Sequence, residues 1–307
     1  MTFSRPNMKS LRVLCIALFL FKPAQAALVE EVIQVPVTVS AAQSEAWTPR
    51  MTVTVFRDDS RVNAPYLVLH HGRPTTAGAQ AAMGRQRFVN SAKYFVGLGF
   101  VVLVPTRVGY GETGGPDLED AGPCQNRRYG SVFETGVDQT ASLLFAAQRL
   151  SYVDLSRGII VGQSVGGMVA IAAASRPLTG LLATVNFAGG HGGNPRTRPG
   201  DPCAEPQLRE TFRAYGASSR VPTLWLYSEN DRFWGPKLPR LWFEAYVDAG
   251  GRAEFVSLPA IGEDGHASFM MNRPAWREVF ESFLLRAGVF EGAFFLVPDP
   301  LSAPVRP

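Results

Sequence analysis

The sequence predicts a single α/β domain with a mostly parallel central sheet and helices on both faces. Short apolar runs without polar alternation, such as Ile159–Val161, are typical of strands that are buried on both faces of a parallel sheet. These runs alternate along the chain with segments of helical length and pattern, which is the order that parallel sheets require. The chain has 307 residues, 46% of them hydrophobic, which is enough for one large core.

The first two expected strands, residues 28–40 and 51–56, alternate apolar and polar side chains. Pro49 and the Asp58-Asp59-Ser60 cluster punctuate them, so we expect an antiparallel pair that opens the sheet. The later strands follow as short buried runs at residues 64–69, 100–104, 159–161, 181–187, 221–227 and 253–258.

The segments between these strands have helical patterns. Residues 134–150 are strongly amphipathic, and residues 168–175 are rich in alanine and stop before Pro177. Pro274 suits the first turn of the closing helix. The expected helices cover residues 91–98, 134–150, 168–175, 205–217, 237–249 and 274–286.

Both ends of the chain differ from the domain between them. Residues 1–26 carry basic residues before a short apolar run and end in Ala24-Gln25-Ala26, which predicts a cleaved secretory signal peptide. Residues 27–290 form the expected domain, and residues 291–307 are a Pro-rich tail. We therefore expect a secreted or periplasmic protein that has no membrane attachment after cleavage.

The formal net charge of +4 comes from the expected signal peptide. Residues 1–26 contain four of the 30 basic residues and no acidic residue, so 26 basic and 26 acidic residues remain in the mature chain. A neutral mature chain gives no electrostatic reason to expect nucleic acid or an anionic membrane as a partner.

Ser164 lies in the pentapeptide Gly162-Gln163-Ser164-Val165-Gly166. A buried strand precedes this G-x-S-x-G pattern and a helix of small residues follows it, which is the context of a nucleophile elbow. The glycines leave room for a tight turn that exposes the serine hydroxyl, and the helix N-terminus offers N–H groups to an oxyanion. The alternative is an ordinary glycine-rich turn whose serine caps the helix.

Candidate functional residues follow the expected strands. Because ligands bind at the carboxyl ends of the strands in open α/β sheets, we expect these loops to meet in one site. The loops cover residues 70–74, 107–111, 164, 189–193, 229–231 and 262–266.

The chain resembles the α/β-hydrolases, in particular the dienelactone hydrolase-like and prolyl-peptidase-like branches. His70-His71-Gly72-Arg73-Pro74 resembles the oxyanion loop of the family, and Pro105-Thr-Arg-Val-Gly-Tyr-Gly111 resembles the R-G-Y-G loop of the peptidase branch. The resemblance covers roughly residues 29 to 286. The sequence departs from the second motif, with R-V-G-Y-G in its place, and it shows no N-terminal propeller like that of large prolyl peptidases.

The family order of Ser, acid and His implies the other two members of a catalytic triad. His266 alone among the four histidines follows a plausible acid loop, so we assign it as the base. Asp231 matches the family position for the acid, and Glu229 is the second candidate. The alternative for all three is a solvated polar loop.

The expected mechanism is nucleophilic acyl transfer. His266 takes the proton of Ser164, Asp231 orients the imidazole, and the backbone N–H groups of Val165 and Arg73 bind the oxyanion. The sequence contains no H-E-x-x-H motif and no paired-cysteine zinc spacing, and we expect neither a metal nor a cofactor.

Substrate contacts are expected from aromatic and basic residues near these loops. Tyr110 and Trp234 are candidates for an apolar pocket, with core packing as the alternative. Arg107 or Arg73 is a candidate for a substrate carboxylate, with ion pairing inside the loop as the alternative.

Three function classes follow from these residues. The first is a hydrolase that cleaves small-molecule carboxylic esters, the second is a peptidase that acts on short peptides, and the third is a non-catalytic binding protein on the same scaffold.

Cys124 and Cys203 are expected to form a disulfide bond. They are the two cysteines left after removal of residues 1–26, and an exported protein meets an oxidising compartment. Both lie in loops after strands that should end near Ser164, so the bond should pin the mouth of the site. Two buried free thiols are the alternative.

Overall fold

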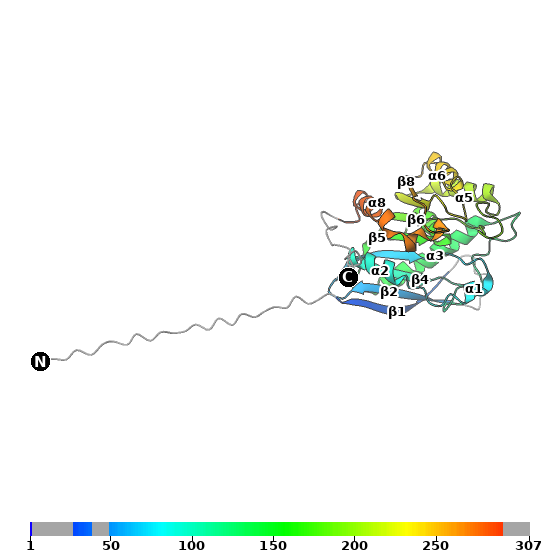
Figure 1. Cartoon of the computed structure of the whole chain (residues 1–307). Coiled ribbons are helices and arrows are strands. Elements are labelled where there is room, and N and C mark those ends of the chain that lie inside the picture. The colour runs from blue at the N-terminus through cyan, green and yellow to red at the C-terminus, as the bar shows by residue number, and fades with distance from the viewer. Residues whose placement is uncertain (2–26, 39–48, 291–307) are drawn as a thin grey trace, which may run out of the picture.

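The computed structural model describes Met1, residues 27–38 and residues 49–290 of the chain. Residues 2–26 of the expected signal peptide and the Pro-rich tail lie outside these residues. In the described part, strands and helices alternate around one mixed sheet (Figure 1). The strands are β1 (Leu28–Pro36), β2 (Arg50–Asp58), β3 (Ala64–His70), β4 (Val101–Thr106), β5 (Val153–Gln163), β6 (Leu181–Phe187), β7 (Thr223–Ser228) and β8 (Ala253–Leu258).

The strand order is β1-β2-β4-β3-β5-β6-β7-β8. β1 and β2 pair antiparallel, and β2 pairs antiparallel with β4, whereas the pairs from β4 through β8 are parallel. The predicted antiparallel opening and mostly parallel sheet are therefore confirmed. The carboxyl ends of β3, β5, β6 and β7 lie together at one edge, where they present the loops that carry the candidate site residues.

Helices cover both faces of the sheet (Figure 1). One core cluster joins one sheet face to α3, α4, α5 and α6, and the second joins the other face to α2 and α8. The helices are α1 (Ala77–Ala81), α2 (Val89–Gly97), α3 (Tyr129–Ala147), α4 (Val165–Ala174), α5 (Glu205–Ser218), α6 (Leu238–Asp248), α7 (Ser268–Met271) and α8 (Arg273–Arg286).

Alternation along the buried strands supplies both clusters. Val68 and Ile160 pack into the first cluster, whereas their neighbours Leu69 and Val161 pack into the second. Successive side chains of a strand point to opposite faces, so strands covered on both sides are apolar at every position.

β5 and α3 show the largest differences in starting residue from the prediction. β5 begins at Val153 rather than Ile159, because polar residues around Asp154 disguise its first half. α3 begins at Tyr129 rather than Glu134, because Gly130 interrupts the amphipathic pattern in its first turn. Gly136, which lies inside the predicted helix, is required by packing, since an added Cβ would lie 2.5 Å from a methyl group of Val169 on α4.

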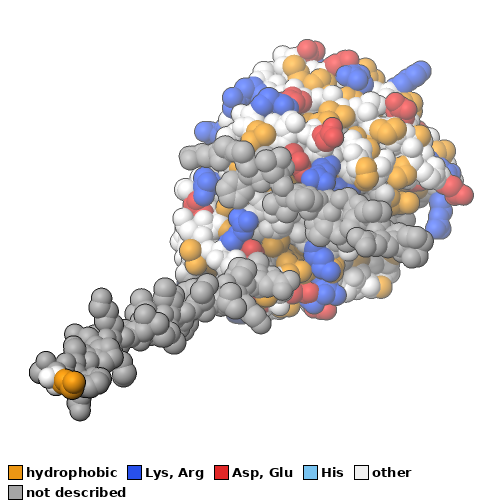
Figure 2. Space-filling model, turned by 60° about the vertical axis from the view of Figure 1, so that its left-hand side comes forward, with side chains coloured by type: hydrophobic (Ala, Val, Ile, Leu, Met, Phe, Trp, Pro, Cys, Tyr) orange, Lys and Arg blue, Asp and Glu red, His pale blue; other side chains and the backbone are white. Residues whose placement is uncertain are grey.

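The surface carries charges of both signs. On the face drawn in Figure 2, acidic and basic side chains are interspersed among apolar ones. Among the described residues, no helix is long and apolar enough to cross a membrane.

Candidate active site

Ser164 lies in a strained turn between β5 and α4. Its φ of 58° and ψ of −123° are unusual for a residue with a side chain, and such backbone strain costs about 1–3 kcal/mol. The flanking positions must be glycine because any side chain would clash with the backbone. A Cβ atom on Gly162 would lie 1.9 Å from the carbonyl oxygen of Gly166, and a Cβ atom on Gly166 would lie 2.5 Å from the carbonyl oxygen of His70. The turn therefore has the geometry that the G-x-S-x-G pattern predicts.

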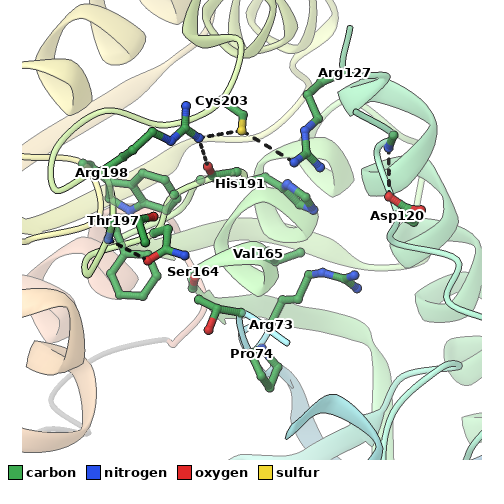
Figure 3. A pocket seen from close by; sticks show the side chains of 18 residues that line it. Arg73, Pro74, Asp120, Arg127, Ser164, Val165, His191, Thr197, Arg198 and Cys203 are labelled. Atoms are coloured by element: carbon green, nitrogen blue, oxygen red, sulfur yellow. Dashed lines mark hydrogen bonds between the residues drawn. The ribbon is translucent and has the colours of Figure 1, made fainter. Parts of the chain in front are cut away.

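The loop after β3 lies against this turn. A Cβ added to Gly72 would be 3.1 Å from the Cβ of Ser164, so a larger residue would push the loop away from the serine. Arg73 follows at once, and with Ser164 and Val165 it lines the same cavity (Figure 3). Arg73 and Val165, the residues expected to bind an oxyanion, therefore line one cavity with Ser164.

His266 lies in a single 3-10 turn, Gly265–Ala267, after β8. Asp264 caps this turn, and its Oδ1 accepts the N–H of His266 at 3.0 Å and that of Arg232 at 3.0 Å. The same carboxylate therefore joins the histidine loop to the loop after β7, and it fixes the position of the His266 backbone.

Asp231 is the acid that reaches His266. Its Oδ2 lies 2.9 Å from Nδ1 of His266, and its Oδ1 accepts the N–H groups of Phe233 and Trp234 at 2.8 and 3.2 Å. The Asp231 side chain is buried, whereas Glu229, the second candidate, is exposed. Geometry therefore favours Asp231.

Aromatic rings hold the imidazole in place. The ring of Phe233 stacks on that of His266 with centroids 3.9 Å apart, and the indole of Trp234 meets it edge-on at 5.6 Å. The indole N–H donates to the carbonyl of Ala188 at 2.8 Å, which fixes Trp234 against the loop after β6. Trp234 is almost fully buried, and it lines the wall of the cavity described next.

Two hollows meet at Ser164. The first, which we call the arginine cavity, has a volume of about 380 Å³ and is drawn in Figure 3. Its polar lining includes Arg73, Asp120, Arg127, His191, Asn194 and Arg198. The second, which we call the methionine groove, has a volume of about 260 Å³. It is lined by Met83, Phe88, Phe233 and Met270 together with Ser164 and His266.

Arg107 corrects a prediction. Its side chain has no exposed surface and forms an ion pair with Glu119, at 2.5 Å from Nε to Oε1 and 3.2 Å from Nη2 to Oε2. It also donates to the carbonyl of His71 at 2.7 Å. Arg107 lines neither hollow, so it does not receive a substrate carboxylate and instead braces the loop that carries Arg73.

Tyr110 is likewise a bracing residue rather than part of the pocket wall. It is fully buried, its hydroxyl donates to Glu119, and its ring meets His71 edge-on at 4.6 Å. The Arg73 guanidinium, the other candidate for a substrate carboxylate, is paired with Asp117 at 2.6 Å from Nη1 to Oδ1.

Breaking the buried Arg107–Glu119 pair is expected to destabilise the fold. Glu119→Gln should lower the free energy of unfolding by about 3–5 kcal/mol, because it leaves the Arg107 charge buried without its counter-ion. Glu134→Gln is the matched control, since its pair with Arg176 is more than a third exposed and should contribute about 0–1 kcal/mol. Urea unfolding measures both. Equal changes in the two variants would contradict the assignment.

Three histidines beside the site are buried and neutral. Burial, and next the charge of Arg107, holds the pKa values of His70 and His71 well below the usual range. Burial, followed by the charge of Arg73, lowers the pKa of His191 to about 4. His71 accepts the N–H of Arg107 at Nε2 and donates from Nδ1 to the carbonyl of Gly72, so it fixes the loop after β3 as one neutral tautomer.

The predicted disulfide between Cys124 and Cys203 is present, with the two Cα atoms 4.9 Å apart. It joins the loop after β4 to the loop after β6, and Cys203 lines the arginine cavity. The bond therefore closes one wall of the cavity, as expected from the sequence.

Sequence reasoning missed Arg127 and Arg198 in this wall. Each lies within five residues of a disulfide cysteine, and this spacing is the signal that could have found them. The described residues contain no group of three metal-ligating side chains.

Solved structures with this architecture come from several hydrolases. An acylaminoacyl peptidase from Pyrococcus horikoshii matches with a TM-score of 0.58 at 15% identity, over 89% of this chain and 44% of that chain. An esterase from Pyrococcus furiosus matches with a TM-score of 0.54 at 13% identity, over 83% of this chain and 90% of that chain. The chain has the α/β-hydrolase fold.

The likeness to the peptidases covers less than half of their structures, and no match is found among protein-family models or curated proteins. A structure described as a dienelactone hydrolase from Klebsiella pneumoniae shares the α/β-hydrolase fold with a TM-score of 0.52 at 15% identity, over 85% of this chain and all of that chain. This chain spans less than half the length of the peptidase structures, 41% for a puromycin-hydrolysing peptidase from Mycobacterium tuberculosis. No protein-family model and no curated protein matches the sequence.

Proposed function

We propose that this chain is a serine hydrolase that cleaves carboxylic esters of small molecules through an acyl-enzyme. The observation that carries the proposal is the hydrogen bond between His266 and Asp231 beside a groove that His266 shares with Ser164. A serine in a strained turn, a base in the same groove and a buried carboxylate behind the base form the arrangement that activates a hydroxyl nucleophile.

In the proposed acylation step, Nε2 of His266 takes the hydroxyl proton of Ser164 as the oxygen attacks the ester carbon. Asp231 accepts the N–H of Nδ1, which fixes the tautomer that leaves Nε2 free and stabilises the imidazolium that forms. The imidazolium then gives the proton to the departing alkoxide. Water, activated by the same imidazole, releases the acid from Ser164.

The oxyanion of the tetrahedral intermediate is proposed to accept the backbone N–H groups of Val165 and Arg73. Val165 is the first residue of α4, so the positive end of the helix dipole adds to its N–H. The buried Arg107–Glu119 pair and His71 hold the loop that carries Arg73. Preorganised donors of this kind contribute about 3–4 kcal/mol each in comparable sites.

Export from the cytoplasm is part of the proposal. The disulfide between Cys124 and Cys203 favours an oxidising compartment, and residues 1–26 have the pattern of a secretory signal peptide. We propose a secreted or periplasmic enzyme that uses neither a metal nor a cofactor for catalysis.

Labelling with a fluorophosphonate tests the proposal. The probe should form an adduct that mass spectrometry places on Ser164, and Ser164→Ala should abolish the labelling while circular dichroism shows a folded protein. Benzyl and p-nitrophenyl esters should be hydrolysed and aminoacyl nitroanilides should not. Turnover of the anilides alone would indicate a peptidase, and absence of both labelling and turnover would indicate a binding protein.

A further inference from the structure

Two arginines of the arginine cavity have no acidic partner among the described residues. Nη2 of Arg198 lies 2.6 Å from Sγ of Cys203, and Nη2 of Arg127 lies 3.6 Å from the same atom. Figure 3 shows the two guanidinium groups on either side of this sulfur. One carboxylate could therefore reach both groups. Nε of Arg127 is also buried, and it has no hydrogen-bond partner among the described residues. Because an unsatisfied buried donor is unfavourable, this group favours a ligand that brings an acceptor oxygen.

The acidic residues in and beside the cavity form no ion pair with these two arginines, and Asp120 is the one carboxylate in a lining that holds three arginines. Asp117 already pairs with Arg73. Asp120 lines the cavity, but it is exposed and accepts the N–H of Gly122 at 2.9 Å. His191 is neutral: its Nε2 donates to the carbonyl of Glu119, and its buried Nδ1 has no hydrogen-bond partner among the described residues. The cavity therefore favours an anion that brings acceptor oxygens.

The methionine groove, which also reaches Ser164, is more apolar than the arginine cavity. Met83, Phe88 and Met270 line it together with Arg73, whose charge is paired with Asp117, and Met270 is 56% exposed. Flexible thioether side chains adapt to apolar groups of different shape. This groove suits an uncharged apolar group.

The position of His266 decides which part of an ester enters which hollow. The leaving oxygen must receive its proton from Nε2, and His266 lines the methionine groove and not the arginine cavity. Val165, whose N–H faces the carbonyl oxygen in the proposed reaction, lines the arginine cavity. The alcohol therefore departs on the groove side and the acyl chain extends toward the arginines.

We propose that the substrates are open-chain half-esters of dicarboxylic acids, whose free carboxylate binds Arg127 and Arg198 and whose apolar alcohol leaves from the methionine groove. This inference rests on the proposed function. The Ser164 oxygen forms a bond to the ester carbon, the bond from that carbon to the alkoxy oxygen breaks, and His266 passes the serine proton to the alcohol. Water then releases a dicarboxylate and restores the serine.

Three benzyl-type esters separate the parts of this proposal. They are monobenzyl adipate, with the carboxylate on the acyl chain, neutral benzyl hexanoate, and the hexanoate ester of 4-(hydroxymethyl)benzoate, with the carboxylate on the alcohol. We expect kcat/KM for monobenzyl adipate to exceed that for benzyl hexanoate by roughly 10- to 100-fold, as two charge-assisted hydrogen bonds allow. The third ester should be the poorest substrate.

The arginine variants assign the preference to the cavity. Arg127→Gln and Arg198→Gln should each reduce the adipate-to-hexanoate ratio about tenfold. Arg196→Gln is the matched control, because Arg196 lies in the loop that carries Arg198 but is exposed and does not line the cavity. This variant should keep the wild-type ratio. A wild-type ratio near one, or a preference for the carboxylate on the alcohol, would overturn the proposal.

A binding measurement separates failure of this proposal from failure of the proposed function. Calorimetry with folded Ser164→Ala should detect adipate binding that Arg127→Gln weakens about tenfold in the same background and Arg196→Gln leaves unchanged. Hydrolysis of benzyl hexanoate without a carboxylate preference would refute the half-ester proposal alone. Absence of fluorophosphonate labelling together with retained adipate binding would refute the proposed catalysis and keep the anion site. Absence of adipate binding refutes the anion site in either case.

Discussion

Replacement of Asp231 by asparagine is expected to lower kcat by about 10⁴-fold with little change in KM, as in the Ser-His-Asp template. An asparagine amide that fills the same space can present its NH₂ group to Nδ1 of His266, now 2.9 Å from a carboxylate oxygen. The imidazole would then carry its proton on Nε2, where it cannot accept the proton of Ser164. Stopped assays with an excess of a p-nitrophenyl ester measure the effect.

Glu229→Gln is the matched control for this experiment. Glu229 lies two residues before Asp231 in the same loop, but it is exposed. The substitution should change kcat less than twofold, in line with the small effects of surface changes. A large loss in Glu229→Gln, with activity retained in Asp231→Asn, would transfer the acid role to Glu229 and contradict the geometry of the site.

Acid should unfold the protein over a narrow pH range that begins near pH 6.5. His70, His71 and His191 have pKa values below the ordinary value in the folded state, mainly because they are buried. The unfolded chain binds protons at these residues as the pH falls below about 6.5, whereas the folded chain does not until its lower pKa values are reached. Folding therefore loses stability as the pH falls.

Each of these histidines contributes about 1.4 kcal/mol per pH unit once the unfolded state is protonated. Together they should lower the free energy of unfolding by about 4 kcal/mol per unit below pH 6, against a typical total of about 5–15 kcal/mol. For His191 this loss continues down to a pH of about 4, its folded-state pKa.

Urea unfolding at a series of pH values measures the slope, which corresponds to an uptake of about three protons. His191→Gln removes one of the three titrating groups, so its slope should fall to about two protons. A flat pH dependence between pH 6 and 5 would show that the folded protein accepts protons at these histidines as readily as the unfolded chain does.

The sequence predicts the turn around Ser164 well because the residues that shape it are local. Ser164 needs a strand before it, a helix after it and small residues on either side, and all of these lie within a few residues along the chain. The sheet follows for a similar reason, since strands buried on both faces are apolar at each position. β5 is the exception, because polar residues near Asp154 occupy its first half.

The walls of the site are not predictable in this way. Whether an arginine meets substrate depends on which carboxylate the fold places beside it, and Arg107 meets Glu119, twelve residues away. Arg127 and Arg198 are 71 positions apart in the sequence and come together where a disulfide joins their loops. The sequence predicts the disulfide bond, but it does not predict that the two arginines lie beside it.

The disulfide between Cys124 and Cys203 makes the two halves of the site depend on different bonds. Hydrogen bonds and packing at the end of the sheet hold Ser164, Asp231 and His266, and a reductant does not break these interactions. The wall that carries Arg127 and Arg198 is closed by a covalent bond that a reductant can open. Protein made in a reducing compartment would thus keep the proposed triad beside an open wall, and the proposed substrate selection, not nucleophilicity, would be the property acquired on oxidation.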